Sequence, residues 1–128
     1  MLAAAALVGA AVLSSPSVPR AQPRSAPDGA ALFASRCSSC HSDRAGEAGM
    51  PGPNLHGLAG RRLGGDPAFD YSPAFASATG TWDAARLDAY LADPEEAVPG
   101  SWMGIGNAVR DAGERAAVVR HLLGGGGG

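Results

Sequence analysis

Five consecutive residues carry the most specific chemistry in the sequence: Cys37, Ser38, Ser39, Cys40 and His41. Two cysteines three positions apart can each add to a vinyl group of a haem, while the adjacent histidine offers an imidazole nitrogen to the iron. A C-x-x-C redox pair and half of a zinc site are the alternatives. The sequence shows neither the second ligand pair of a zinc site nor the strand pattern of a thioredoxin, so the run predicts one covalently attached haem c.

A second axial ligand to the iron needs a lone pair, and the candidate side chains are Met50, His56, Met103 and His121. Met103 lies in a loop with Pro and Gly far downstream of His41, so it can approach the opposite face of the haem. Met50 is too close to His41 in sequence for that role, and we expect the other two histidines to be surface or packing residues. Met103 is therefore favoured, and a thioether opposite an imidazole implies a raised reduction potential.

The length and composition of the chain limit the size of the fold and the classes of partner that the protein is expected to bind. The chain has 128 residues, enough for one small domain whose core would gain much from an apolar prosthetic group. Both of its cysteines belong to the haem motif, so no intramolecular disulfide is expected. All ten basic residues are arginine and the formal net charge is −2, which argues against nucleic acid as a partner.

The two termini differ in composition from the middle of the chain. Residues 1–21 predict a secretory signal peptide, because the apolar run 1–13 is too short to span a bilayer comfortably and a Ser/Pro-rich stretch follows it. Cleavage is expected within 15–21, and an uncleaved anchor with membrane contact is the alternative. Residues 22–27 would be a linker and 124–128 a disordered glycine tail. Export agrees with haem c, which is attached beyond the cytoplasmic membrane, and predicts the periplasm.

Residues 28–123 form the predicted all-α domain, in which short helices alternate with long loops. Capping residues before amphipathic spacing mark the helix starts, and Gly and Pro mark the loops. The predicted elements are a helix over 29–37 capped by Asp28, an irregular loop over 42–65, a short helix beginning near Ser72, a helix from Asp83 that stops before Pro94, a one-turn helix over 95–98, a loop over 98–106 and a last helix over 111–123. The expected packing face of that last helix is Ala117, Val118, His121 and Leu122.

These residues resemble the class I cytochromes c, the mitochondrial-type family that includes the small soluble c cytochromes of bacteria. The resemblance covers Gly29 to Leu122. It is carried, besides the haem motif, by Gly29, Phe33, Gly52-Pro-Asn-Leu-His-Gly-Leu58, Gly60-Arg61, Trp82, Tyr90-Leu91 and Pro99-Gly-Ser-Trp-Met103. It implies the cytochrome c fold, with a few short helices and long loops wrapped around one haem, and the role of an electron carrier without enzymatic activity.

The resemblance also implies roles for individual residues. It places the axial methionine at Met103, and a backbone carbonyl at Gly52-Pro53 as the acceptor for the second ring nitrogen of His41. Residues implied to donate hydrogen bonds to the haem propionates are Arg61, Tyr71, Ser72, Trp82 and Ser101, with simple core filling as the alternative for Tyr71 and Trp82. Tyr90 would complete the haem pocket.

Three positions depart from the family pattern. Phe75 stands where mitochondrial relatives carry a small polar residue beside buried water, and Ile105 where an aromatic ring covers the haem edge. His121 stands where an aromatic ring meets the first helix. We nevertheless expect Gly29 and Phe33 to pack against the last helix near Val118 and His121.

The expected function is one-electron transfer between respiratory or photosynthetic partners, such as a quinol-oxidising complex, a terminal oxidase, a reaction centre or a dehydrogenase. No small-molecule substrate is expected, because six-coordinate iron leaves no open position, and the protein should be a monomer. A haem peroxidase or gas-binding protein is the alternative if Met103 does not bind, and a haem subunit of a periplasmic dehydrogenase is another.

The residues expected to surround the haem edge also differ from those of mitochondrial relatives, which carry lysines at the positions of Glu95, Glu96 and Trp102. Because lysines that would attract an acidic partner are missing, we expect docking through an apolar patch centred on Trp102.

Overall fold

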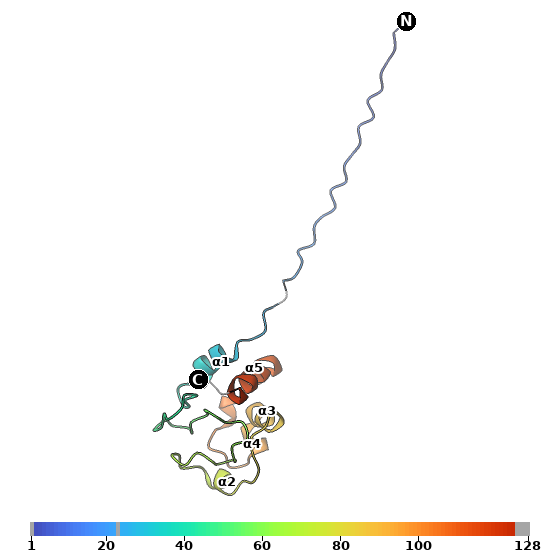
Figure 1. The fold of residues 1–128 in the computed structure, drawn as a ribbon. Coiled ribbons are helices and arrows are strands. Elements are labelled where there is room, and N and C mark those ends of the chain that lie inside the picture. Colours follow the sequence, from blue (N-terminus) through green and yellow to red (C-terminus); the bar gives the residue numbers. More distant parts are fainter. Residues whose placement is uncertain (1, 23, 125–128) are drawn as a thin grey trace.

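The structure of the protein is a computed structural model that describes residues 2–22 and 24–124. Up to residue 28 the described chain is exposed, has no regular secondary structure and extends away from the folded part (Figure 1). Within the two described ranges, no helix has the length and apolar character that a membrane span requires. The signal peptide over 1–21 and the linker over 22–27 stay predictions. Of the predicted glycine tail, residues 125–128 lie outside the described residues.

The folded part consists of short helices joined by loops (Figure 1). The helices are α1 (Gly29–Arg36), α2 (Pro73–Ala76), α3 (Ala84–Ala92), α4 (Pro94–Ala97), the 3-10 turn η1 (Ile105–Asn107) and α5 (Ala112–Leu123). The part of the chain that the structure describes contains no β-strand, only an isolated bridge between Arg62 and Thr81. The predicted all-α class is confirmed, and each predicted α-helix is present with ends close to those expected. The sequence pattern does not predict η1.

Each α-helix starts at a side chain that accepts hydrogen bonds from first-turn amides. The caps are Asp28, Ser72, Asp83, Asp93 and Asp111. Replacing such a cap by alanine typically costs about 1 kcal/mol. Asp93 also ends α3, while its Oδ1 accepts the amide of Glu96 at 3.0 Å to begin α4. One aspartate therefore fixes the angle at which these two helices meet.

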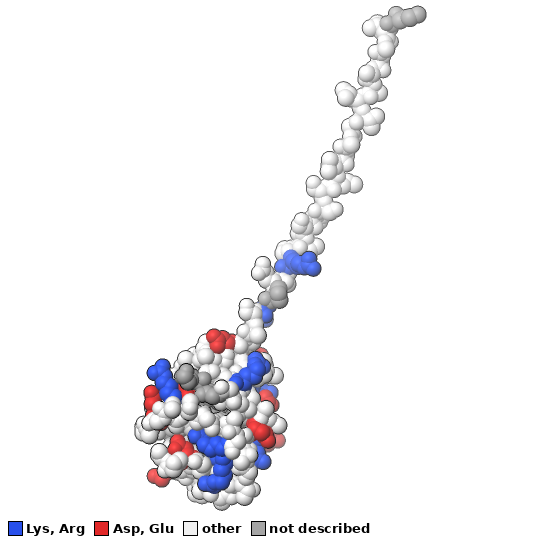
Figure 2. All heavy atoms as spheres, viewed as in Figure 1, with Lys and Arg blue, Asp and Glu red and all other residues white. Residues whose placement is uncertain are grey.

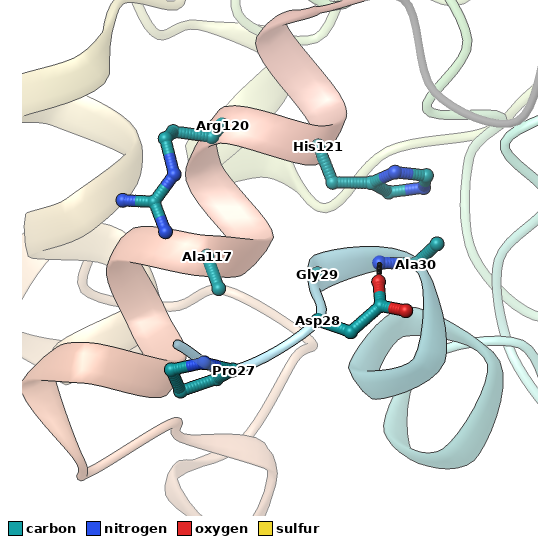
Figure 3. A pocket seen from close by; sticks show the side chains of 7 residues that line it. All are labelled: Pro27, Asp28, Gly29, Ala30, Ala117, Arg120 and His121. Atoms are coloured by element: carbon teal, nitrogen blue, oxygen red, sulfur yellow. Dashed lines mark hydrogen bonds between the residues drawn. The ribbon is translucent and has the colours of Figure 1, made fainter. Parts of the chain in front are cut away.

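Helices α1 and α5 pack through a glycine at the very start of α1 (Figure 3). A Cβ atom at Gly29 would overlap the carbonyl oxygen of Ala117, so only glycine fits there. The buried ring of Phe33 lies 5.7 Å from the ring of His121, measured between centroids. The expected packing of Gly29 and Phe33 against the last helix is confirmed.

The core joins α3 and α5 to α1 and to the loops. Helix α3 contributes Leu87, Tyr90 and Leu91, and α5 contributes Ala117, Val118, Val119 and Leu122. The predicted face of α5 is thus buried except for His121, which is only partly buried, and Val119 adds to it. A second group of buried side chains, Leu58, Leu63, Phe75, Trp82 and Val109, comes from α2 and the loops.

Candidate haem site

The cysteine–histidine motif begins where α1 ends, and it forms a hydrogen-bonded turn. The amide of Cys37 donates to the carbonyl of Phe33 at 2.8 Å, and the amides of Cys40 and His41 donate to the carbonyl of Cys37 at 3.0 and 2.9 Å. Cys37 is half-buried and Cys40 is exposed, and the two form no disulfide with each other. Burial raises the pKa of the Cys37 thiol, although the Arg36 guanidinium opposes the shift. One turn therefore presents both thiols directly before the imidazole.

The imidazole of His41 is held by the backbone of the following loop. Its Nδ1 lies 2.8 Å from the carbonyl oxygen of Pro53. Because a carbonyl can only accept, Nδ1 carries the proton and the Nε2 lone pair is left for a metal. Burial lowers the pKa of His41 and favours this neutral ring. Gly52 lies so close that a Cβ atom there would overlap the imidazole. The loop thus supplies the acceptor expected at Gly52-Pro53, while iron ligation by His41 stays a prediction.

Asn54, the residue after Pro53, is a hydrogen-bonding centre that our sequence analysis did not single out. Its Nδ2 donates to the carbonyls of Arg44 and Glu47, both at 2.7 Å, and its Oδ1 accepts the amide of His56 at 2.7 Å. Its own amide donates to Asp66 Oδ2 at 2.9 Å. Asn54 therefore fixes the peptide that carries the Pro53 carbonyl. Two signals were available in the sequence: Asn54 follows the predicted acceptor carbonyl, and it belongs to the run 52–58 that carries the family resemblance.

The hydrogen bonding of the Arg61 guanidinium shows whether the pocket fits a haem. Its Nε is the one buried side-chain nitrogen or oxygen in the described residues that has no hydrogen-bond partner, while its Nη2 donates to the Asn54 carbonyl at 2.5 Å. A buried N–H without an acceptor costs about 1–3 kcal/mol, and more when it belongs to a charged group. A carboxylate is the acceptor that a guanidinium matches best, and a haem carries two as propionates. The unpaired Nε therefore fits the predicted role of Arg61.

Tyr71 and Ser72 add two hydroxyl groups near the start of α2. Tyr71 Oη accepts the amide of Asp66 at 3.1 Å, and the buried Ser72 Oγ accepts the amide of Phe75 at 3.4 Å. Each hydroxyl keeps its own proton to donate. Burial is the main cause that raises the pKa of Tyr71, so its phenol stays protonated and able to donate. Both residues can therefore act as the predicted propionate donors.

Phe75 joins the predicted pocket residues into one aromatic cluster. Its ring centroid lies 5.9 Å from Tyr71, 6.1 Å from Trp82 and 5.4 Å from Tyr90. Trp82 and Tyr90 also meet edge to face at 5.5 Å. Phe75, Trp82 and Tyr90 are buried. The departure from the family pattern at Phe75 thus places an apolar ring at the centre of this cluster.

A short polar chain links this cluster to the loop that carries Met103. Tyr90 Oη lies 2.6 Å from Ser101 Oγ, which also accepts the amide of Met103 at 3.3 Å. Burial raises the pKa of Tyr90, so the phenol remains neutral. Met103 itself is half-buried and packs against the core. The structure therefore ties the predicted ligand loop to α3 through Ser101.

The two other histidines have polar partners of their own. His56 Nδ1 lies 3.1 Å from the carbonyl oxygen of Asp43, and His121 Nε2 lies 2.7 Å from the carboxylate of the same residue. These contacts agree with packing roles, as expected. Met50 is half-buried. The hollow drawn in Figure 3, between the start of α1 and α5, contains none of the predicted haem contacts.

The arrangement as a whole fits a covalent haem c. It offers two thiols on one turn, a neutral imidazole fixed through Nδ1, an unpaired buried guanidinium N–H, and an apolar cluster of aromatic rings. No group of three or more His, Cys, Asp or Glu side chains within the described ranges is arranged to hold a metal ion by itself.

Comparison with known proteins identifies the same protein family as the sequence resemblance does. A family model described as "Cytochrome c" matches residues 26–123. Cytochrome c2 iso-1 of Magnetospirillum molischianum is 41% identical over 88 residues, which are 68% of this chain and 87% of that protein. Cytochrome c of Kluyveromyces lactis is 35% identical over 95 residues, 74% of this chain and 86% of that protein. A "Cytochrome c homolog" of Bradyrhizobium diazoefficiens is 36% identical over 115 residues, 89% of this chain and 62% of that protein.

Proposed function

The chain belongs to the cytochrome c family and binds one covalent haem c, and from that premise we propose that it is a periplasmic one-electron carrier. Haem c, when bound, supplies an iron that takes up and releases a single electron. In this proposal Cys37 and Cys40 would hold the haem through thioethers, and His41 and Met103 would be the protein ligands of its iron. With both side chains bound, no position on the iron would be left for a substrate, so the protein would transfer electrons without catalysing a reaction of its own.

The observation that carries the proposal is the 2.8 Å contact between His41 Nδ1 and the Pro53 carbonyl. A histidine that donates its second ring proton to a carbonyl has a fixed orientation and a more basic ligating nitrogen. Asn54 anchors that loop through its side chain and its amide, and the amide of Gly52 donates to the Cys40 carbonyl at 2.7 Å. A rigid ligand moves little when the charge on the iron changes, which favours fast electron exchange.

The other side chains of the pocket would bury the haem and hold its propionates. Arg61 offers its free Nε–H, and Tyr71 and Ser72 offer hydroxyl protons. The rings around Phe75 exclude water, and an apolar surrounding disfavours the additional positive charge of the ferric state. Trp82, Tyr90 and Ser101 complete the proposed pocket. These residues together would raise the reduction potential.

The proposed location and partners rest on the N-terminal segment and on the family. An apolar run followed by a Ser/Pro-rich stretch is typical of an exported precursor. A periplasmic carrier with a raised potential would accept electrons from a quinol-oxidising complex or a dehydrogenase. It would pass them to a terminal oxidase or a photosynthetic reaction centre.

Near-infrared spectroscopy of the ferric protein tests this function. A charge-transfer band typical of iron bound to methionine is expected, and Met103→Ala should abolish it, lower the potential and allow peroxide or carbon monoxide to bind. Met50→Ala is the matched control and should keep the band. If the unaltered protein lacks the band and binds these ligands, it is a haem enzyme or gas-binding protein, and the carrier proposal is wrong.

A further inference from the structure

Two large apolar side chains are exposed on either side of Met103. Trp102 has 68% of its surface exposed and Ile105 has 46%. The other exposed large hydrophobic residues of the described chain all lie before residue 19, in the extended N-terminal segment. An exposed tryptophan has no packing role to explain it, and tryptophan is the side chain most enriched at the energetic centres of protein interfaces. We call Trp102 and Ile105 the 102–105 patch.

Three carboxylates border this patch. Asp93, Glu95 and Glu96 line a surface hollow together with Ile105. The Glu95 carboxylate also accepts the amide of Gly100 at 3.3 Å, which ties α4 to the loop before Trp102. Among the described residues, none of these three carboxylates forms a salt bridge. We call them the acidic rim.

Some other acidic side chains of the folded part do form salt bridges. Glu114 contacts Arg36 at 2.8 Å, and Asp88 contacts Arg115 at 2.7 Å. Residues 28–124 contain all twelve acidic residues but only eight of the ten arginines, which gives this part a formal net charge of −4. Figure 2 shows positive and negative side chains mixed over the face in view. The unpaired carboxylates next to the 102–105 patch therefore give that site a negative field of its own.

We propose that the 102–105 patch and the acidic rim together form the surface on which a basic protein partner docks, with Trp102 as its apolar anchor. The partner would present lysine or arginine side chains around an apolar spot. This inference rests on the proposed function, because the patch flanks Met103 and a partner seated there lies next to the electron-carrying group. A second copy of this chain does not fit, since two acidic rims would face each other.

The two components of the surface would act differently. The exposed carboxylates steer the approach of a positively charged partner, and salt screens their effect within about 8–10 Å at physiological ionic strength. Trp102 and Ile105 supply apolar contact that salt does not weaken. Association should therefore become slower as salt is added, without being lost.

A peptide titration followed by nuclear magnetic resonance tests the proposal. The haem-loaded, reduced protein is labelled with nitrogen-15 and titrated with a short peptide of alternating lysine and leucine, and separately with one of alternating glutamate and leucine. The lysine peptide should shift the indole N–H of Trp102 and the amides of Glu96 and Ile105, and added salt should weaken its binding. The glutamate peptide should cause no such shifts.

Variants with matched changes in charge locate the surface. Trp102→Ala should weaken binding of the lysine peptide roughly tenfold, and Glu96→Gln roughly twofold to threefold. Asp88→Asn removes one negative charge from α3, and its amide oxygen can still accept from Arg115. This control should leave the affinity nearly unchanged. An equal effect of Asp88→Asn and Glu96→Gln, or none of Trp102→Ala, would overturn the proposal.

Two further outcomes would also overturn it. One is equal binding of both peptides, and the other is movement of the Trp102 signal with protein concentration alone, which would assign the patch to a second copy. Electron exchange with hexaammineruthenium and with ferricyanide tests the carrier function independently. A reversible one-electron couple without peptide binding would reject the docking surface alone, whereas the absence of any exchange would reject the carrier function.

Discussion

His121 Nε2 lies 2.7 Å from Asp43 Oδ2, and the two side chains are only 13% and 15% exposed. The same imidazole lies against Phe33 of α1, with 5.7 Å between the ring centroids and 44° between the ring planes. At a position where the family pattern has an aromatic ring, histidine thus keeps a ring contact with the first helix and adds a polar contact. That contact ties the last helix to the loop that directly follows the haem motif.

Substitutions at His121 separate the contribution of its ring contact with Phe33 from that of its polar contact with Asp43. His121→Phe keeps a ring on Phe33 but leaves the mostly buried Asp43 carboxylate without this partner, so the free energy of unfolding should fall by about 1–3 kcal/mol. Denaturant unfolding of the haem-loaded protein measures the change. The double variant His121→Phe/Asp43→Ala should recover part of the loss, because no carboxylate is then buried. A single variant as stable as the unaltered protein would show that the contact contributes nothing.

Gly52→Ala should disturb the proposed iron ligand directly. The new methyl group would overlap the His41 imidazole, so the ring must turn away from the Pro53 carbonyl. We expect a smaller fraction of low-spin haem in the ferric optical and electron paramagnetic spectra. Gly106→Ala is the control, because a Cβ atom there meets nothing within 4 Å. Identical spectra for the two variants would contradict the close approach of Gly52 to the ring.

Asn54→Ala should act on His41 through the loop. Losing three side-chain hydrogen bonds should lower the free energy of unfolding by about 2–3 kcal/mol. If Asn54 positions the Pro53 carbonyl, the reduction potential and the chemical shift of the His41 Nδ1 proton should also change. Asn107→Ala, in the exposed turn η1, should alter none of these values. A loss of stability with an unchanged proton shift would limit Asn54 to holding the loop.

The two tyrosines of the chain should both ionise at unusually high pH. Burial raises the pKa of Tyr71 and of Tyr90 in the folded protein. The folded state therefore holds these protons more tightly than the unfolded state, and their contribution to stability is complete below pH of about 10 and lost as the pH rises beyond it. Carbon-13 labelling of the tyrosine rings follows each phenol, and Tyr90→Phe assigns the signals. A phenol that titrates at or below its ordinary pKa would refute this prediction.

Local sequence was sufficient for the helices, because each start depends on one capping side chain and its next few amides. Asp28 and Asp83 cap as the sequence indicates, and Ser72 and Asp111, where the sequence indicates that helices begin, are caps as well. The haem motif could also be predicted from local sequence, since both cysteines and the histidine lie within one turn. The pocket residues needed the family resemblance, because no local pattern identifies Arg61 or Tyr71.

Long-range polar contacts could not be predicted from the sequence. The hydrogen bond between His121 and Asp43 joins residues 78 positions apart, and no local sequence pattern near either residue indicates it. Asn54 lies in an irregular loop, where its bonds depend on how the chain folds back over residues 44–47. The acidic rim likewise depends on the fold, which brings Ile105 beside α4.

The packing of α1 against α5 through Gly29 has a consequence for the path of the chain. The start of α1 lies beside Ala117 and His121 (Figure 3), within the last two turns of α5, so the first and last helices of the domain are neighbours. Domains whose ends meet tolerate circular permutation and insertion into other proteins. A short peptide could therefore join Leu123 to Asp28. The domain could equally be inserted into a host protein, or repeated in tandem, with little strain on its fold.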